Sequence, residues 1–305
     1  MPETVLGRAT AADVITTPFP HIVIRDALPA DLVARLKAER PSFETVLTGR
    51  ENLRGSLPQN ARVHYLGQEL LTAPTVANVW KDFVTAHTSP DFFAQLRAVF
   101  GAQLRALHPV LQRRFGGLER MTAGLRHAGD HARADILLDA LLVFNTPVVS
   151  SGTSVRRAHL DSPHKLFTGL LYLRDPADDS RGGDLELCAF TPGGPRGFDG
   201  PQIDSACVTP VKTISYDNNV LVMFLNSLGS VHGVTVRHPT AHRRCYVSLV
   251  GELQQPLFDL APYQLPAHRK AIRQVAGLGR RALRKARKVA TRALGSGHGA
   301  DQSAR

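Results

Sequence analysis

The triplet His159-Leu160-Asp161 places an imidazole and a carboxylate two positions apart, a spacing that could serve metal binding. Alternate residues of a β-strand point to the same face, so the two side chains would lie side by side if this segment is extended. Two histidines and one carboxylate on one face of an octahedron hold mononuclear Fe(II) and leave positions open for other ligands. In a chain with 13 histidines, one such triplet also arises by chance, and a structural hydrogen-bonded pair is the plain alternative.

The missing ligand would be a histidine far along the chain, on a neighbouring strand. His232 is the candidate, because it lies 71 residues after Asp161 and follows the apolar stretch NNVLVMFLN and a turn. Arg243 and Arg244 come about a dozen residues later and open the segment RRCYVSLV. An arginine there could bind a carboxylate co-substrate through two parallel hydrogen bonds. A slip of one residue reverses the faces of a strand, so spacing alone does not choose between the two arginines.

The elements that must position these groups change character at about residue 135. Before that point, residues 21–28 predict a short strand and residues 28–41 a helix. Residues 42–75 are polar and predict irregular structure, and residues 75–101 predict two helices that are broken at Ser89-Pro90.

After residue 135 the pattern is that of short strands, rich in apolar and β-branched residues and separated by Gly, Pro, Asn and Asp. Such spacing favours an antiparallel sandwich or barrel, and the gaps are too short for the helices of a doubly wound parallel sheet. The candidate strands are 135–149, 165–175, 182–191, 206–217, 218–226, 231–237 and 243–253.

Composition narrows the class of protein. A hydrophobic fraction of 43% predicts a proper core, and three widely spaced cysteines without a CxxC motif predict neither a zinc ribbon nor a disulfide framework. The N-terminus has no basic segment followed by an apolar one, and no apolar run reaches the length of a membrane span. We therefore expect a cytoplasmic protein.

The net charge of +11 is concentrated at the C-terminus. Residues 267–305 hold eleven Lys and Arg against one acid, Asp301, whereas the other residues hold 26 basic and 25 acidic side chains. Residues 269–294 predict a basic helix with a narrow stripe of small apolar residues. The plain interpretation is a solvated helix; the alternatives are peripheral contact with an anionic membrane or with an acidic partner. No aromatic residue is interleaved for base stacking, so we expect no specific nucleic-acid binding.

The chain resembles the iron(II)/2-oxoglutarate-dependent oxygenases of the prolyl 4-hydroxylase-like group in five motifs that occur in the same order: HLD, LLYLRD, GGDLEL, NSLGSVHGV and RRCYVSL. The resemblance covers roughly residues 135–252, and PFPHIVIRDALPADL is similar to the start of bacterial members. It implies an α+β fold with a double-stranded β-helix (jelly-roll) core over residues 135–265. Residues 1–134 would be a strand and supporting helices of the same catalytic domain, and residues 266–305 a basic helical tail.

The resemblance also implies roles. His159, Asp161 and His232 match the metal triad and are the expected catalytic residues. Arg244 matches the residue that binds the far carboxylate of 2-oxoglutarate, with Arg243 as its rival. The remaining matches are Tyr172, which contacts the same carboxylate in some members, Thr168 as a weaker candidate on the same face, and the structural turn Gly182-Gly183.

The implied reaction is a dioxygenase reaction with Fe(2+), 2-oxoglutarate and O2, and with ascorbate as an optional reductant. It hydroxylates a C–H bond of a peptidyl or small-molecule substrate and releases succinate and CO2. Halogenating relatives lack the carboxylate ligand, so Asp161 favours hydroxylation. Two alternatives stay open, a non-catalytic jelly-roll ligand-binding protein and a cupin-like metalloenzyme that does not use 2-oxoglutarate.

Overall fold

The computed structural model describes residues 3–50, 57–126, 132–192 and 197–266. The predicted basic helical tail lies outside these residues. The α-helices are α1 (Ala30–Ala38), α2 (Phe43–Val46), α3 (Gly67–Thr72), α4 (Asn78–His87), α5 (Pro90–Leu107) and α6 (Val110–Phe115). The strands are β1 (His21–Arg25), β2 (Arg62–Tyr65), β3 (Ala123–Leu125), β4 (Ile136–Asn145), β5 (Lys165–Tyr172), β6 (Leu185–Phe190), β7 (Phe198–Asp199), β8 (Gln202–Ile203), β9 (Val208–Ile214), β10 (Val220–Leu225), β11 (His232–Val234) and β12 (Arg244–Leu253).

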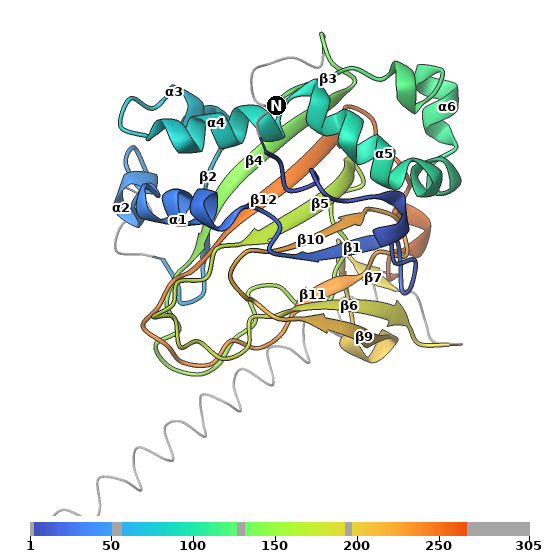
Figure 1. The fold of residues 1–305 in the computed structure, drawn as a ribbon. Coiled ribbons are helices and arrows are strands. Elements are labelled where there is room, and N and C mark those ends of the chain that lie inside the picture. The colour runs from blue at the N-terminus through green and yellow to red at the C-terminus, as the bar shows by residue number, and fades with distance from the viewer. Residues whose placement is uncertain (1–2, 51–56, 127–131, 193–196, 267–305) are drawn as a thin grey trace, which may run out of the picture.

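Most strands form a large and a small sheet that face each other, and β7 and β8 pair as a two-stranded sheet. The large sheet has the order β1-β10-β5-β12-β4-β2, with all neighbours antiparallel, and β3 adds a short parallel pairing to β4. The small sheet has the antiparallel order β11-β6-β9. Figure 1 shows the helices over one face of the large sheet and the small sheet on its opposite side. Helices that precede an antiparallel, sheet-rich core are consistent with the predicted jelly-roll architecture.

The alternation of side chains along the central strands divides the large sheet into two faces. On β12, Cys245, Val247 and Leu249 join the core cluster that includes the helices, whereas Tyr246 and Val250 pack toward the small sheet. Both faces are covered, which explains why this strand and β4 read as nearly continuous apolar runs rather than as alternating ones.

The N-terminal helices share the core of the large sheet. Trp80 of α4 and Phe92, Phe93 and Phe100 of α5 are at most 1% exposed and lie in the same cluster as the outer face of β4. The break between the two helices falls where predicted, with Ser89 capping α5 through a hydrogen bond from Phe92 N and Pro90 as its first residue. These aromatic residues are therefore structural.

Two sequence expectations are wrong in detail. Residues 42–75 are not irregular, because they contain α2, β2 and α3, elements too short for a clear hydrophobic period. The segment around His159 is also not a regular strand. His159 forms only isolated bridges, to His232 and Gln202, and Asp161 precedes a turn that the hydrogen bond from Lys165 N to Ser162 O closes.

The turn Gly182-Gly183 has a clear conformational reason. Both residues have positive φ, +73° and +82°, and a Cβ on Gly182 would lie 1.9 Å from the carbonyl oxygen of Val236. We expect Gly182→Ala to lower the free energy of unfolding by about 3 kcal/mol, at the upper end of ordinary substitutions. Gly200→Ala is the matched control, because Gly200 has φ +61° but nothing within 4 Å of its added Cβ. Urea denaturation of both variants measures the difference, and equal losses would refute the steric explanation.

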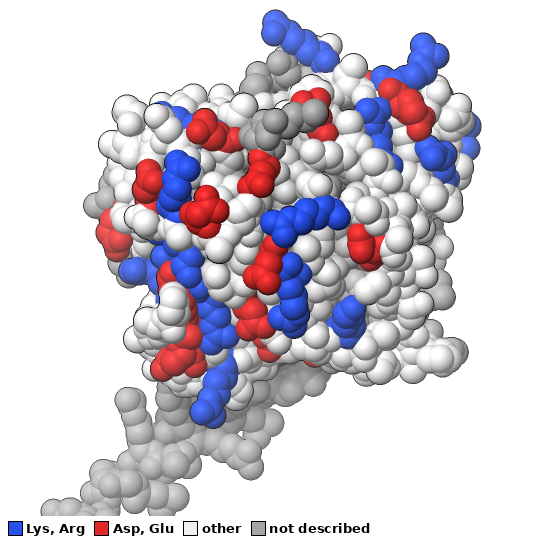
Figure 2. Space-filling model, viewed as in Figure 1, with Lys and Arg blue, Asp and Glu red and all other residues white. Residues whose placement is uncertain are grey.

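Charge is mixed on the face of the molecule that Figure 2 shows. Figure 2 shows basic and acidic side chains interspersed on the face that carries β1 and the N-terminal helices, as the near balance of charges before residue 267 predicts. Within the described ranges, we find no helix that combines the length and the apolar character needed to span a bilayer.

Candidate metal centre

The two predicted histidine ligands are held in one orientation by their own backbone. Nδ1 of His159 donates to the carbonyl of Arg157 (2.7 Å), and Nδ1 of His232 donates to that of Ser230 (2.9 Å). A carbonyl can only accept, so the proton lies on Nδ1 and each Nε2 keeps a free lone pair. This is the second-sphere arrangement that prepares an imidazole for a metal.

The segments that carry these histidines are joined directly. His159 N donates to His232 O (2.9 Å), and His232 N donates to His159 O (3.0 Å). Asn226 strengthens this junction, since its side-chain amide donates to the carbonyls of Ser162 and Lys165, and its side-chain carbonyl accepts from Ser230 Oγ. The imidazole rings end 4.2 Å apart, centroid to centroid. The junction replaces the regular strand that the sequence predicts.

Asp161 completes the cluster. Leu160 packs into a separate apolar cluster with Val231 and Cys188, while Asp161 faces the two imidazoles. The carboxylate oxygens lie 4.0 Å from Nε2 of each histidine, and one potential ligand atom from each residue lies within 4.8 Å of the others. The structure thus brings together the three residues that the sequence singled out.

The protonation states suit a metal site. Burial lowers the pKa of His159 to about 2, with a further contribution from His232, and burial also lowers the pKa of His232. Burial raises the pKa of Asp161, but Lys165, the two histidines and Thr168 outweigh it, so the pKa lies well below its usual range. At neutral pH the cluster is two neutral imidazoles and one carboxylate, the forms that bind a divalent cation.

Thr168 has a definite contact at this centre. Its hydroxyl donates to Asp161 Oδ2 at 2.7 Å, and Lys165 Nζ lies 3.4 Å from the same oxygen. The resemblance predicts that Thr168 helps to bind the co-substrate. In the structure, however, its hydroxyl proton is used in the hydrogen bond that orients the Asp161 carboxylate.

Arg244 and Arg243 point to opposite sides of the sheet. Arg244 is 3% exposed and lines the same cavity as the three candidate ligands. Arg243 instead lies over the Phe43 ring (4.3 Å to its centroid) and 3.4 Å from Glu44, outside that cavity. The pairing of Arg244 with Asn145 on β4 sets this register and places Tyr246 and Ser248 on the cavity side with it.

The guanidinium of Arg244 lies among three tyrosine rings, with distances to their centroids of 5.0 Å for Tyr172, 4.8 Å for Tyr216 and 5.0 Å for Tyr246. Within the described residues, its Nε and Nη2 and the Tyr172 hydroxyl have no hydrogen-bond partner. Burial raises the pKa of Tyr172 to about 12, so its hydroxyl remains a donor. A buried cation with unsatisfied donors is costly, and a carboxylate would satisfy them.

The candidate ligands and Arg244 line one cavity of about 410 Å³. Leu170, Leu185 and Val234 supply apolar wall, and Gln202 and Ser248 supply neutral polar groups. Two further cavity residues were not predicted from the sequence: Lys165, and Arg62, which reaches the cavity from β2. No local pattern marks Arg62, because it lies almost 100 residues before the ligand triplet in a segment that reads as irregular.

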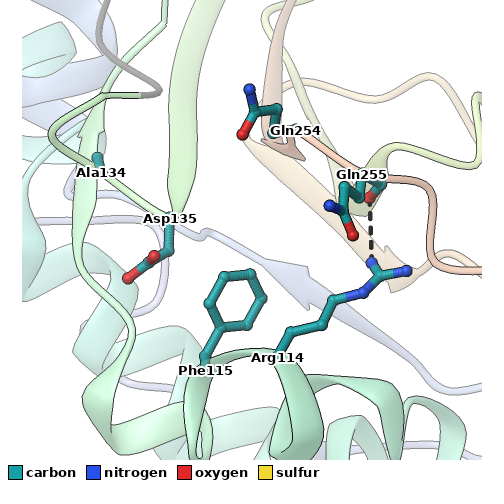
Figure 3. A pocket seen from close by; sticks show the side chains of 6 residues that line it. All are labelled: Arg114, Phe115, Ala134, Asp135, Gln254 and Gln255. Atoms are coloured by element: carbon teal, nitrogen blue, oxygen red, sulfur yellow. Dashed lines mark hydrogen bonds between the residues drawn. The ribbon is translucent and has the colours of Figure 1, made fainter.

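A second cavity of about 210 Å³ lies between α6 and the end of β12 (Figure 3). Its two charged groups are already engaged: Arg114 donates to the carbonyls of Gln255 and Pro256, and Asp135 accepts from Thr122. This cavity has no group arranged for catalysis among its described lining residues, so we regard the metal cluster as the candidate site.

Among known proteins, solved structures match the chain, whereas no family model and no curated protein does. A prolyl-4-hydroxylase from Pseudomonas putida is 15% identical with a TM-score of 0.37, covering 77% of this chain and 93% of its own. AviO1 from Streptomyces viridochromogenes is 16% identical with a TM-score of 0.41, covering 77% and 90%. The epimerase SnoN, solved with Fe3+, alpha ketoglutarate and nogalamycin RO, is 12% identical with a TM-score of 0.38, covering 81% and 86%.

The chain is thus similar to solved prolyl-4-hydroxylases and to other iron- and 2-oxoglutarate-dependent enzymes, the group that its motifs resemble. Identities and TM-scores of this size are too low to assign a family. We therefore base the function on the geometry of the site.

Proposed function

We propose that the protein is an Fe(II)- and 2-oxoglutarate-dependent dioxygenase that hydroxylates a C–H bond of a peptidyl or small-molecule substrate and releases succinate and CO2. One observation carries the proposal. A cluster of two neutral histidines and one carboxylate shares a cavity with a buried arginine, Arg244, whose Nε and Nη2 have no hydrogen-bond partner among the described residues.

The strand order supports a double-stranded β-helix for this core. Along the chain, β4, β5, β10 and β12 belong to the large sheet, and β6, β9 and β11 to the small one. The bridge between His159 and His232 adds the ligand segment to the edge of the small sheet, next to β11. Two groups of four antiparallel segments are the number a jelly roll requires.

The residues of the cavity suit both Fe(II) and 2-oxoglutarate. Nε2 of His159, Nε2 of His232 and a carboxylate oxygen of Asp161 would hold Fe(II), and three ligands on one face leave positions for the co-substrate and O2. Arg244 and the Tyr172 hydroxyl would bind the far carboxylate of 2-oxoglutarate. Iron with 2-oxoglutarate and O2 supplies the oxidising power that breaks the substrate C–H bond.

Other residues of the chain orient the three candidate metal ligands and enclose the site that binds the co-substrate. Thr168 fixes Asp161 through its hydrogen bond, and the carbonyls of Arg157 and Ser230 fix the two imidazoles. The tyrosine rings around Arg244 exclude water and so strengthen its pairing with a carboxylate. Arg243 has no part in this assignment.

Release of succinate tests the proposal without knowledge of the substrate. Purified protein with Fe(II), ascorbate and 2-oxoglutarate should form succinate slowly even when no substrate is added, and a panel of peptides and metabolites should contain compounds that accelerate it. Omission of Fe(II) is the control. Protein that binds 2-oxoglutarate but forms no succinate under any condition would instead be a non-catalytic binding protein.

A further inference from the structure

We infer that the substrate of this site carries an anionic group, a carboxylate or a phosphate, which Arg62 and Arg156 bind with help from Lys165. The inference rests on the proposed function and adds the chemical class of the substrate. It comes from charges at the metal cavity that neither the metal nor the co-substrate uses.

The three cations come from separate parts of the chain and line one cavity. Arg62 lies on the edge strand β2, Arg156 precedes the ligand His159 by three residues, and Lys165 begins β5. An adjoining cavity of about 280 Å³ is also lined by Arg62 and Lys165, which therefore lie where two cavities meet. Its carboxylate, Glu252, lies 3.0 Å from Arg126. A substrate that approaches the metal here passes within reach of the three cations.

The charges of the loaded site leave these cations available for a further anion. Within the described lining of the cavity, Asp161 is the sole carboxylate. The two positive charges of Fe(II) and that of Arg244 are balanced by Asp161 and the two carboxylates of 2-oxoglutarate. Arg62, Arg156 and Lys165 then stay without compensation beside the reaction centre.

Their present contacts are weak or shared. The nearest acid to Arg156 is Asp161, at 3.5 Å, and Lys165 has the same partner at 3.4 Å. The side chain of Arg62 is exposed and makes no hydrogen bond or ion pair with the described residues, and it lies close enough to Arg156 to repel it electrostatically. Once a metal binds the Asp161 carboxylate, its charge is no longer available to either partner.

Several partly buried arginines elsewhere in the described residues have carboxylate or carbonyl partners. Arg40 lies 2.9 Å from Asp175, Arg126 lies 3.0 Å from Glu252, and Arg174 donates to the carbonyls of Tyr216, Asp178 and Ser180. Arg62 and Arg156 differ from these: the Arg62 side chain is exposed and has no partner among the described residues, and the Arg156 side chain is 40% exposed and shares Asp161 with Lys165. Two guanidinium groups that face one site are suited to bidentate binding of a carboxylate or a phosphate.

The experiment uses protein loaded anaerobically with Fe(II) and saturating N-oxalylglycine, a non-reactive mimic of 2-oxoglutarate. Calorimetry then compares phenylacetate, phenyl phosphate and the neutral 2-phenylethanol as probes. We expect at least one anion to bind about tenfold or more tightly than the neutral probe, and the anion that binds identifies carboxylate or phosphate chemistry. Equal affinities, or no binding of either anion, would overturn the inference.

Variants of Arg62 and Arg156 test whether these two arginines bind the anion. The double variant Arg62→Gln/Arg156→Gln should lose anion affinity by about tenfold or more, while Arg35→Gln, an exposed arginine on α1, should leave it unchanged. Retained affinity in the double variant would contradict the inference. Both variants should still bind N-oxalylglycine; a parallel loss in the double variant would mean that the arginines serve the co-substrate instead. If the unaltered protein fails to bind N-oxalylglycine, the proposed function itself has failed.

Discussion

Replacing either His159 or His232 by alanine is expected to weaken Fe(II) binding more than about 100-fold and to abolish succinate release. Loss of an outer-sphere partner alone costs 10- to 100-fold in metal affinity, so loss of a direct ligand should cost more. Each imidazole presents Nε2 to a buried carboxylate, and the other two ligands cannot hold the cation alone. Asp161→Ala should act in the same way.

Metal content after dialysis and calorimetric titration with Fe(II) under anaerobic conditions measure this effect. His238→Ala is the control, because His238 is an exposed histidine outside the cluster. Circular dichroism should show that all variants are folded. Full metal affinity and turnover in the His159→Ala and His232→Ala proteins would show that the cluster is a structural hydrogen-bonded group.

Arg244→Gln is expected to weaken 2-oxoglutarate binding about 100-fold, whereas Arg243→Gln should leave it unchanged. Removal of a buried charged partner costs several kcal/mol, because the carboxylate loses its cation and two donors, and each 1.4 kcal/mol is a factor of ten. Arg244→Lys should give an intermediate loss, since it keeps the charge but not the planar pair of donors.

Calorimetry with N-oxalylglycine on the three arginine variants separates these cases. Iron content should stay normal in all three, because neither arginine is a ligand. A loss of affinity in Arg243→Gln with normal affinity in Arg244→Gln would invert the assignment. A loss in both would point to a general effect on β12.

The parts of the candidate site that lie in short sequence motifs could be predicted from the sequence. The spacing in His159-Leu160-Asp161 also arises by chance in a chain with 13 histidines, and it predicts the metal cluster only together with the ordered motifs that follow it, which include the histidine after an apolar strand and turn. The sequence also singles out Arg243 and Arg244, but it does not show which of them faces the cavity. That depends on the face of the sheet to which each side chain points. The pairing of Arg244 with Asn145 and of Tyr246 with Tyr172 settles that face, and sequence spacing does not contain it.

Other features could not be read from local sequence. Arg62 belongs to a strand of four residues, too short for a period, and reaches the cavity only because β2 pairs with the end of β4. The ligand segment was expected to be a strand, yet the position of Asp161 depends on its hydrogen bond to Thr168 and on the tie between Asn226 and Ser162. Long helices such as α5, by contrast, follow from amphipathic spacing and a capped start.

In the proposed function, the metal cluster and Arg244 together form one binding site for 2-oxoglutarate. The most direct measurement is anaerobic calorimetric titration of N-oxalylglycine into the full chain, with and without Fe(II). We expect one binding site per chain with Fe(II) present and a loss of affinity of about 100-fold or more when the metal is removed. Binding that is equally strong without metal, or no binding with it, would show that the metal cluster and Arg244 do not form a shared site.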